Sequence, residues 1–162
     1  MPARGMLNRV DVDVLIEEGV RLGSGPLVGF GMRREDLHGA LGGEGEPLDA
    51  FVCGTDWAAT FTTCGLSVTV SATTAAGLDI IALYAGGPDP AVVALDGIDL
   101  FGWPADEVVD ALLDLGWPVG SRNRTNAWIG PRRLWLAAAG GRSAPDKRFT
   151  SATLYSPALC KG

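Results

Sequence analysis

The sequence predicts an α+β fold made of two tandem copies of one unit, a helix followed by a four-stranded antiparallel meander. Three pairs of similar segments share one spacing, and self-similarity of this kind is typical of repeated units. The spacing is 71 residues (101 − 30, 128 − 57 and 155 − 84), and it relates Phe30-Gly31 to Phe101-Gly102, Trp57 to Trp128, and Leu83-Tyr84 to Leu154-Tyr155. The predicted organisation is an N-terminal segment, 1–25, followed by repeat 1, 26–87, and repeat 2, 88–162, packed as one compact unit.

The first part of the chain is expected to supply helices and four strands. Valine alternates with aspartate near residue 12, which favours a strand, but Leu15-Ile16-Glu17-Glu18 favours a helical turn, and we expect a short helix near 11–19. A helix is predicted over 33–41, because Leu37 and Leu41 share one face and two glycines follow. β-Branched and aromatic residues between short turns predict strands at 50–53, 57–63, 66–71 and 78–85, with one buried face and one solvated face.

The second repeat contains the clearer helix, which begins near Pro104 and ends at Gly116. Proline suits the first helical position, and the acidic pair Asp106-Glu107 complements the helix dipole. The apolar stripe of this helix consists of Val108, Ala111, Leu112 and Leu115. Strands are predicted at 117–119, 127–130, 133–139 and 148–156, with polar loops at 121–126 and 140–147 and a join between the repeats at 86–90.

Composition and charge narrow the classes of function. The chain has 162 residues, 47% hydrophobic and 20% charged, which is ordinary for a globular protein with a core. Its net charge of −6 is uneven, because residues 1–120 hold 18 acidic and 5 basic side chains (−13) and residues 121–162 hold 1 and 8 (+7). This acidity argues against a nucleic acid as the main ligand. No apolar run approaches the ~20 residues of a membrane helix, the start does not resemble a secretory signal, and a cytosolic location is expected.

No motif in the sequence names a reaction. His38 is the only histidine, so a nucleophilic triad lacks its base, and no spacing of histidine and cysteine suits a metal. No metal or cofactor is therefore predicted. The cysteines Cys53, Cys64 and Cys160 are interpreted as free thiols in a reducing compartment, with a Cys53–Cys64 bridge as the alternative.

Gly31-Met32-Arg33-Arg34, at the start of the first predicted helix, resembles the Gly-Met-x-Arg that opens the repeats of the β-lactamase inhibitory proteins. The predicted layout of the whole chain is similar to the architecture of that family, although the paired cysteines of the secreted family are missing. The segment from Leu95 to Leu113 also resembles small bacterial proteins of the sort that include immunity proteins for polymorphic toxins. These resemblances imply a protein that neutralises a partner enzyme by covering it.

We therefore predict a non-enzymatic protein-binding module, an immunity or inhibitor protein that occludes a bacterial toxin or enzyme. A basic toxin enzyme, as in a toxin–antitoxin pair, suits the acidic charge, since complementary charges speed association. The predicted contacts lie on and beside the second helix, and they are Trp103, Asp106, Asp110, Asp114 and Trp117. In the alternative interpretation of these residues, the tryptophans pack the helix onto its sheet and the aspartates form a solvated face.

Two other hypotheses stay open. One is a small-molecule-binding or catalytic domain with a site between the repeats, lined by Asp96, Asp99 and the arginines of 122–133. A capped turn before the second helix is the favoured explanation of the two aspartates. The other is a purely structural subunit, or a homodimer that forms through an exposed sheet edge.

Overall fold

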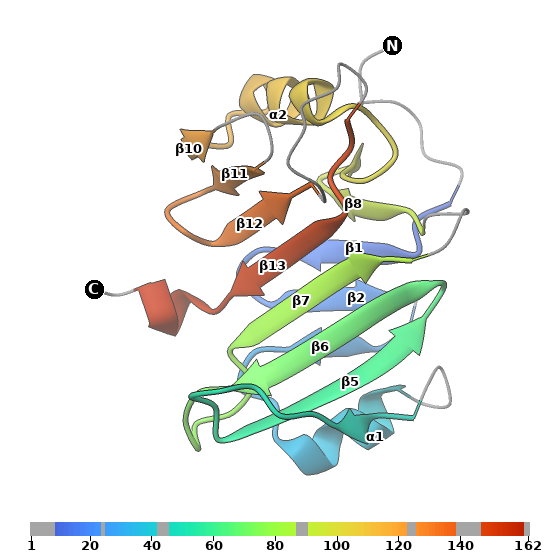
Figure 1. The fold of residues 1–162 in the computed structure, drawn as a ribbon, viewed down its shortest axis with the longest axis vertical. Coiled ribbons are helices and arrows are strands. Elements are labelled where there is room, and N and C mark those ends of the chain that lie inside the picture. The colour runs from blue at the N-terminus through green and yellow to red at the C-terminus, as the bar shows by residue number, and fades with distance from the viewer. Residues whose placement is uncertain are drawn as a thin grey trace.

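Two β-sheets and two short α-helices make up the fold (Figure 1). The computed structural model describes residues 9–23, 25–41, 46–86, 91–122, 126–138 and 147–160. The larger sheet contains β4 (Leu48–Asp49), β5 (Trp57–Thr63), β6 (Leu66–Ala72), β7 (Ile80–Ala85), β10 (Val119–Arg122), β11 (Asn126–Ile129), β12 (Leu134–Ala137) and β13 (Ser151–Tyr155). The smaller sheet contains β1 (Val12–Leu15), β2 (Gly19–Leu22), β3 (Leu27–Gly29), β8 (Val93–Leu95) and β9 (Ile98–Asp99). The helices are α1 (Arg34–Leu41), α2 (Ala105–Asp114) and a 3-10 helix, η1 (Pro157–Cys160).

The eight-stranded sheet (the large sheet) has the order β10-β11-β12-β13-β7-β6-β5-β4, and all its neighbouring strands are antiparallel. Its inward side chains form rows of cross-strand partners. One buried row consists of Phe61, Val68, Leu83, Ala152, Leu136 and Ala127, and the next of Ala59, Val70, Ile81, Leu154, Leu134 and Ile129. Burying a large aliphatic side chain stabilises a fold by ~1.5–3 kcal/mol, so the buried rows of this inner face contribute much of the core's stability.

The five-stranded sheet (the small sheet) covers that inner face together with both helices. Its order is β3-β2-β1-β8-β9, and β1 pairs in parallel with β8. In Figure 1 the small sheet lies behind the large sheet, with α2 at the upper end and α1 at the lower end. Val12 and Val93 of the small sheet, Leu37 of α1 and Leu112 of α2 belong to one buried cluster with the inner rows.

Two of the three predicted helices and several predicted strands are confirmed. The helix expected over 33–41 is α1, and the helix expected from Pro104 is α2, which ends before Gly116, a residue with φ of 93°. The strands expected at 57–63 and 66–71 are β5 and β6. Long runs of alternating β-branched residues, and an apolar stripe of helical period, are the local signals that tertiary packing rarely overrides.

The predicted fold class is wrong. The chain is not an α+β protein made of two copies of a helix and a four-stranded meander, because its described part is mainly β, with 43% strand in sheets of five and eight strands and only two short helices. Two features produced the difference. Short strands of two to four residues form a second sheet that the sequence reading did not anticipate, and β13 pairs with β7, so that the strands of 57–85 and 119–155 form one sheet.

Individual elements account for this error. The helix expected near 11–19 is instead the hairpin of β1 and β2, in which the alternation of valine and aspartate has prevailed over the helical tetrapeptide. Residues 50–53 are not a strand, since the edge strand β4 ends at Asp49. The repeat also fails at its tryptophans. Trp57 packs against the core, whereas Trp128 lies on the opposite face of the large sheet.

The predicted polar loops lie largely outside the described residues. The residues outside the described part are 123–125 of the loop expected at 121–126, 140–146 of the loop expected at 140–147, and 87–90 of the join expected at 86–90. Residues 121, 122 and 126 belong to β10 and β11. The division of the chain at 1–25, 26–87 and 88–162 stays a prediction.

Candidate protein-binding face

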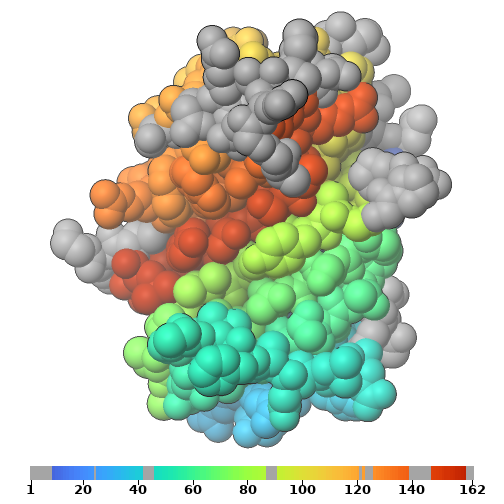
Figure 2. Space-filling model, viewed as in Figure 1, coloured from blue at the N-terminus to red at the C-terminus, as the bar shows by residue number. Residues whose placement is uncertain are grey.

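The outward side chains of the large sheet form a face that points away from the small sheet and both helices. A central row of cross-strand partners crosses it from β11 to β4, and this row consists of Trp128, Trp135, Thr153, Ala82, Thr69, Thr60 and Leu48. The two flanking rows are Asn126, Ala137, Ser151, Tyr84, Ser67 and Thr62 on one side, and Tyr155, Ile80, Ser71 and Ala58 on the other. These three rows are the outer face, which is turned to the viewer in Figures 1 and 2.

The outer face carries no charged side chain, although 20% of the chain's residues are charged and its net charge is −6. Its polar groups are hydroxyls of serine, threonine and tyrosine and the amide of Asn126. A solvated sheet face of this width usually alternates apolar residues with lysine and glutamate. Depletion of charge and the presence of tryptophan and tyrosine are features of the centre of a protein–protein interface, whereas the serines and alanines of the face are not.

An aromatic cluster occupies the end of the outer face near β11. The rings of Trp128 and Trp135 lie 4.8 Å apart at 48°, and those of Trp128 and Tyr155 lie 5.6 Å apart at 45°. These separations are in the range of favourable aromatic pairs, which stabilise by ~0.5–1.5 kcal/mol beyond the area they bury. None of the three belongs to the buried core or to the residues packed against it. The cluster is therefore a half-buried aromatic group on the outer face.

Apolar side chains also stand at the opposite end of the outer face. Leu48, the last residue of the central row, is 65% exposed, and Phe51, which follows β4, is 93% exposed. In Figure 2 the teal segment that precedes β5 protrudes at this lower end. Phe51 and Leu48 together add exposed apolar surface to this end of the face.

The acidic side chains predicted as contacts lie on α2, away from the outer face. Arg122 of β10 forms ion pairs with Asp106 at 2.9 Å and with Asp110 at 3.6 Å. Both aspartates are largely exposed, and Asp114 is exposed as well. The structure thus places the three aspartates on one helix and Arg122 beside two of them. The pairing with Arg122 was not predicted from the sequence.

The two predicted contact tryptophans flank α2 and are half-buried. Trp103 and Trp117 both pack against the hydrophobic core, and Trp117 Nε1 donates a hydrogen bond to Asp96 Oδ2 at 2.9 Å. These contacts agree with the alternative interpretation, in which the tryptophans fix α2 to the fold. The aromatic residues of the outer face, Trp128 and Trp135, are half-buried as well and were not among the predicted contacts. The signal that could have identified them is the period of two in their strands, which places each next to a buried aliphatic residue.

The carboxylates of the alternative, inter-repeat site have structural partners. Asp99 accepts hydrogen bonds from the N–H groups of Phe101 at 3.2 Å and Gly102 at 2.9 Å, which confirms the capped turn before α2. A Cβ at Gly102 would collide with the Asp99 carboxylate, so a larger residue there would displace Asp99 from this turn. Arg133, one of the arginines predicted to line that site, pairs with Glu17 at 3.2 Å.

One carboxylate on the small sheet is perturbed. Burial raises the pKa of Asp13 above its ordinary value of 3.8; Arg21, its cross-strand partner, opposes this shift, and the charge of Asp96 adds to it. The side chain is only partly buried. We assign it no chemical role.

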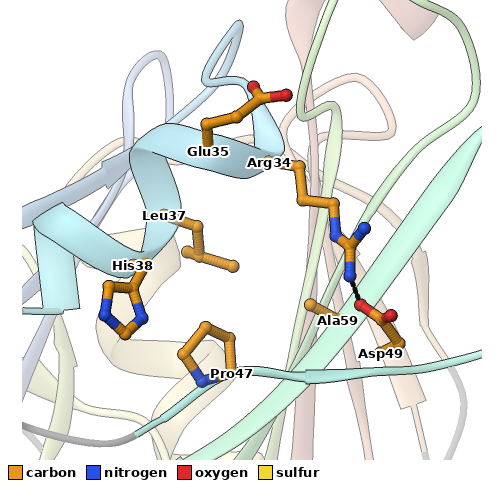
Figure 3. A pocket seen from close by; sticks show the side chains of 7 residues that line it. All are labelled: Arg34, Glu35, Leu37, His38, Pro47, Asp49 and Ala59. Carbon is orange, nitrogen blue, oxygen red and sulfur yellow. Dashed lines mark ion pairs between the residues drawn. The ribbon is translucent and has the colours of Figure 1, made fainter.

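A pocket of about 290 Å³ lies between α1 and the start of the large sheet (Figure 3). Its lining residues are Arg34, Glu35, Leu37, His38, Pro47, Asp49 and Ala59. Arg34 reaches across to Asp49 and forms an ion pair with it (Figure 3). Because Asp49 engages the guanidinium, the pocket presents no unopposed cation to an anionic ligand.

Among the described residues, no group of three or more histidine, cysteine, aspartate or glutamate side chains could hold a metal ion. Cys53 and Cys64 are free and exposed, so the bridge considered between them is not formed. The side chain of Cys160 lies outside the described part of the chain.

No protein-family model matches the chain, and no curated protein or solved structure is significantly similar to it. Within the described ranges, no helix combines the length and the apolar character needed to cross a membrane.

Proposed function

We propose that this chain is a protein-binding module that acts by covering part of another protein with the outer face of its large sheet. The observation that carries the proposal is the absence of charge from three rows of outward side chains on an otherwise acidic protein. Such a face gains little from remaining solvated, and it can be buried without leaving an unpaired charge in the interface.

The aromatic cluster supplies the expected anchor. Tryptophan and tyrosine dominate the residues that contribute most to binding, particularly where surrounding contacts exclude water. The rings of Trp128, Trp135 and Tyr155 are tilted by 45–48° and contact one another. They do not form a flat row of separate rings on which sugars could stack. This geometry supports a protein as the partner in preference to a polysaccharide.

An inhibitor or immunity protein is the specific form of the proposal. Covering an enzyme requires a broad, rigid surface, and an antiparallel sheet backed by a packed core is rigid. The balance of −13 over residues 1–120 would speed association with a basic enzyme, while the uncharged face would form the close contact. A cytosolic location belongs to the same proposal, and the exposed thiols of Cys53 and Cys64 support a reducing compartment.

A capture experiment with matched variants tests this function. Tyr84 on the outer face and Leu113 on α2 are each 46% exposed, so lysine at either position has similar access to water. Tagged wild-type chain is expected to retain a stoichiometric protein from its native host. Tyr84→Lys should lose that protein, and Leu113→Lys should keep it. Asp114→Lys tests the α2 surface in parallel. Retention by Tyr84→Lys together with loss by Asp114→Lys would transfer the site to α2, and no specific capture by the wild type would contradict the proposal.

A further inference from the structure

We infer that a second copy of this chain occupies the outer face when no other protein covers it, in a face-to-face dimer whose two-fold axis runs parallel to β7. This inference rests on the proposed function only in using the same face. It concerns the resting state of the chain, which a partner enzyme would convert into a heterodimer.

The first argument is the order of side chains along the central row. Ala82 stands in the middle, with Thr153, Trp135 and Trp128 toward β11 and Thr69, Thr60 and Leu48 toward β4. A two-fold rotation about an axis along β7 places β12 on β5 of the other copy and β11 on β4. The bulky Trp135 then faces the small Thr60, and Trp128 faces Leu48. A larger side chain thus meets a smaller one at both ends of the row, whereas the two small Ala82 side chains meet at the axis, next to the two Tyr84 side chains.

The second argument concerns the exposed apolar residues at the two ends of the face. The aromatic cluster lies at the β11 end, and Phe51, 93% exposed, lies at the β4 end. The same rotation brings each end of one copy onto the opposite end of the other. In an isologous dimer, the aromatic cluster of each copy therefore covers the β4 end of the other copy, so that both apolar ends of both copies are buried.

Charges at the margin of the face are also self-complementary under this rotation. Asp56, which directly precedes β5, is exposed at the end of the sheet where β5 and β12 begin. Arg132, exposed in the turn before β12, lies at the same end. Because the axis parallel to β7 exchanges β5 with β12 and leaves the strand direction unchanged, Asp56 of each copy approaches Arg132 of the other.

The size of the face sets the expected strength. The strands from β11 to β4, spaced ~4.8 Å apart, extend roughly 29 Å, and five residues along each extend about 17 Å, so the planar area is about 500 Å². Because Ala58, Ser71 and Ala82 of this face are already buried in the single chain, two copies together bury at most about 1,000 Å². This area lies at the lower limit for a biological interface and below the standard ~1,600 Å². An interface of this size suits a weak, exchangeable dimer, which a tighter partner could displace.

Sedimentation equilibrium of the purified chain tests the dimer directly. Tyr84 lies on the proposed axis, so Tyr84→Lys would place two positive charges beside each other and should raise the dimer dissociation constant at least about tenfold. The equally exposed Leu113→Lys, outside the face, should leave it unchanged. Circular dichroism of both variants establishes that each is folded.

A charge exchange at the margin adds a test that misfolding cannot imitate. Asp56→Arg should weaken the dimer, and the double variant Asp56→Arg with Arg132→Asp should restore it. Arg132 has φ of 56°, a conformation that aspartate tolerates, so the second substitution fits the turn. A wild-type chain that stays monomeric at every concentration, equal weakening by Leu113→Lys, or no rescue by the double variant would overturn the dimer. A monomer that captures a host protein through Tyr84 would contradict the dimer and leave the proposed function intact. A dimer that captures no host protein would support the dimer and contradict the proposed function.

Discussion

Truncation of Trp135 should cost little stability, whereas truncation of its neighbour Leu136 should cost much. Leu136 points into the core and is fully buried, so Leu136→Ala removes apolar contacts and leaves a cavity, at an expected cost of ~2–5 kcal/mol. Trp135 is a larger side chain, and its removal from a core would cost ~3–5 kcal/mol. It lies on the outer face, however, where it contacts Trp128. The expected loss is that of one aromatic pair and some cross-strand packing, about 0.5–1.5 kcal/mol.

Urea unfolding followed by far-UV circular dichroism measures both variants without relying on tryptophan fluorescence. The measurements belong at dilution, where the chain is monomeric and self-association does not contribute to stability. A cost for Trp135→Ala equal to or above that for Leu136→Ala would refute the reasoning, because it would mean that the outer face is already buried by the chain's own residues.

Three further predictions concern other parts of the fold. Gly77→Ala should destabilise by at least ~1–3 kcal/mol in thermal unfolding, because φ is 115° there and a Cβ would stand 2.5 Å from the carbonyl oxygen of Gly31; an unchanged melting temperature would show that the β6–β7 loop does not lie against Gly31. Asp13→Asn should raise the melting temperature at pH 7. Because the pKa of Asp13 is raised in the folded state, the stability that its protonation adds is complete only below pH 3.8 and is lost as the pH rises through the folded-state pKa. The higher melting temperature of Asp13→Asn should therefore vanish below pH 3.8, and a difference that persists there would count against burial as the cause. Arg122→Gln should cost less than ~1 kcal/mol, since its partners on α2 are exposed, and the difference should shrink in high salt.

Local signals in the sequence were sufficient for α2, β5 and β6, because each has a long run of one period. They were insufficient for the small sheet. Its strands have two to four residues, and their pairing depends on contacts such as Val12 with Val93, which are 81 residues apart (93 − 12). The repeated spacing of 71 residues was also misleading, because similarity along the chain does not show which face of the sheet each side chain occupies. A shift of one residue moves a side chain to the other face, which is why Trp57 and Trp128 point in opposite directions.

The candidate site shows a related limit of sequence reasoning. Charge and tryptophan beside an obvious helix drew attention to α2, where Arg122 pairs with Asp106 and Asp110 and where Trp103 and Trp117 pack inward. The outer face has no such local concentration. Its threonines, serines and aromatic residues are spread over seven strands, and they become one surface only when the order and register of those strands are known.

Site-specific photo-crosslinking inside the native host tests the central claim most directly. A photoreactive phenylalanine analogue in place of Tyr84 should form a covalent adduct with a second, different protein, and the same analogue in place of the equally exposed Leu113 should not. If Tyr84 yields no such adduct, or if Leu113 yields the same one, the outer face of the large sheet is not the surface through which this chain acts.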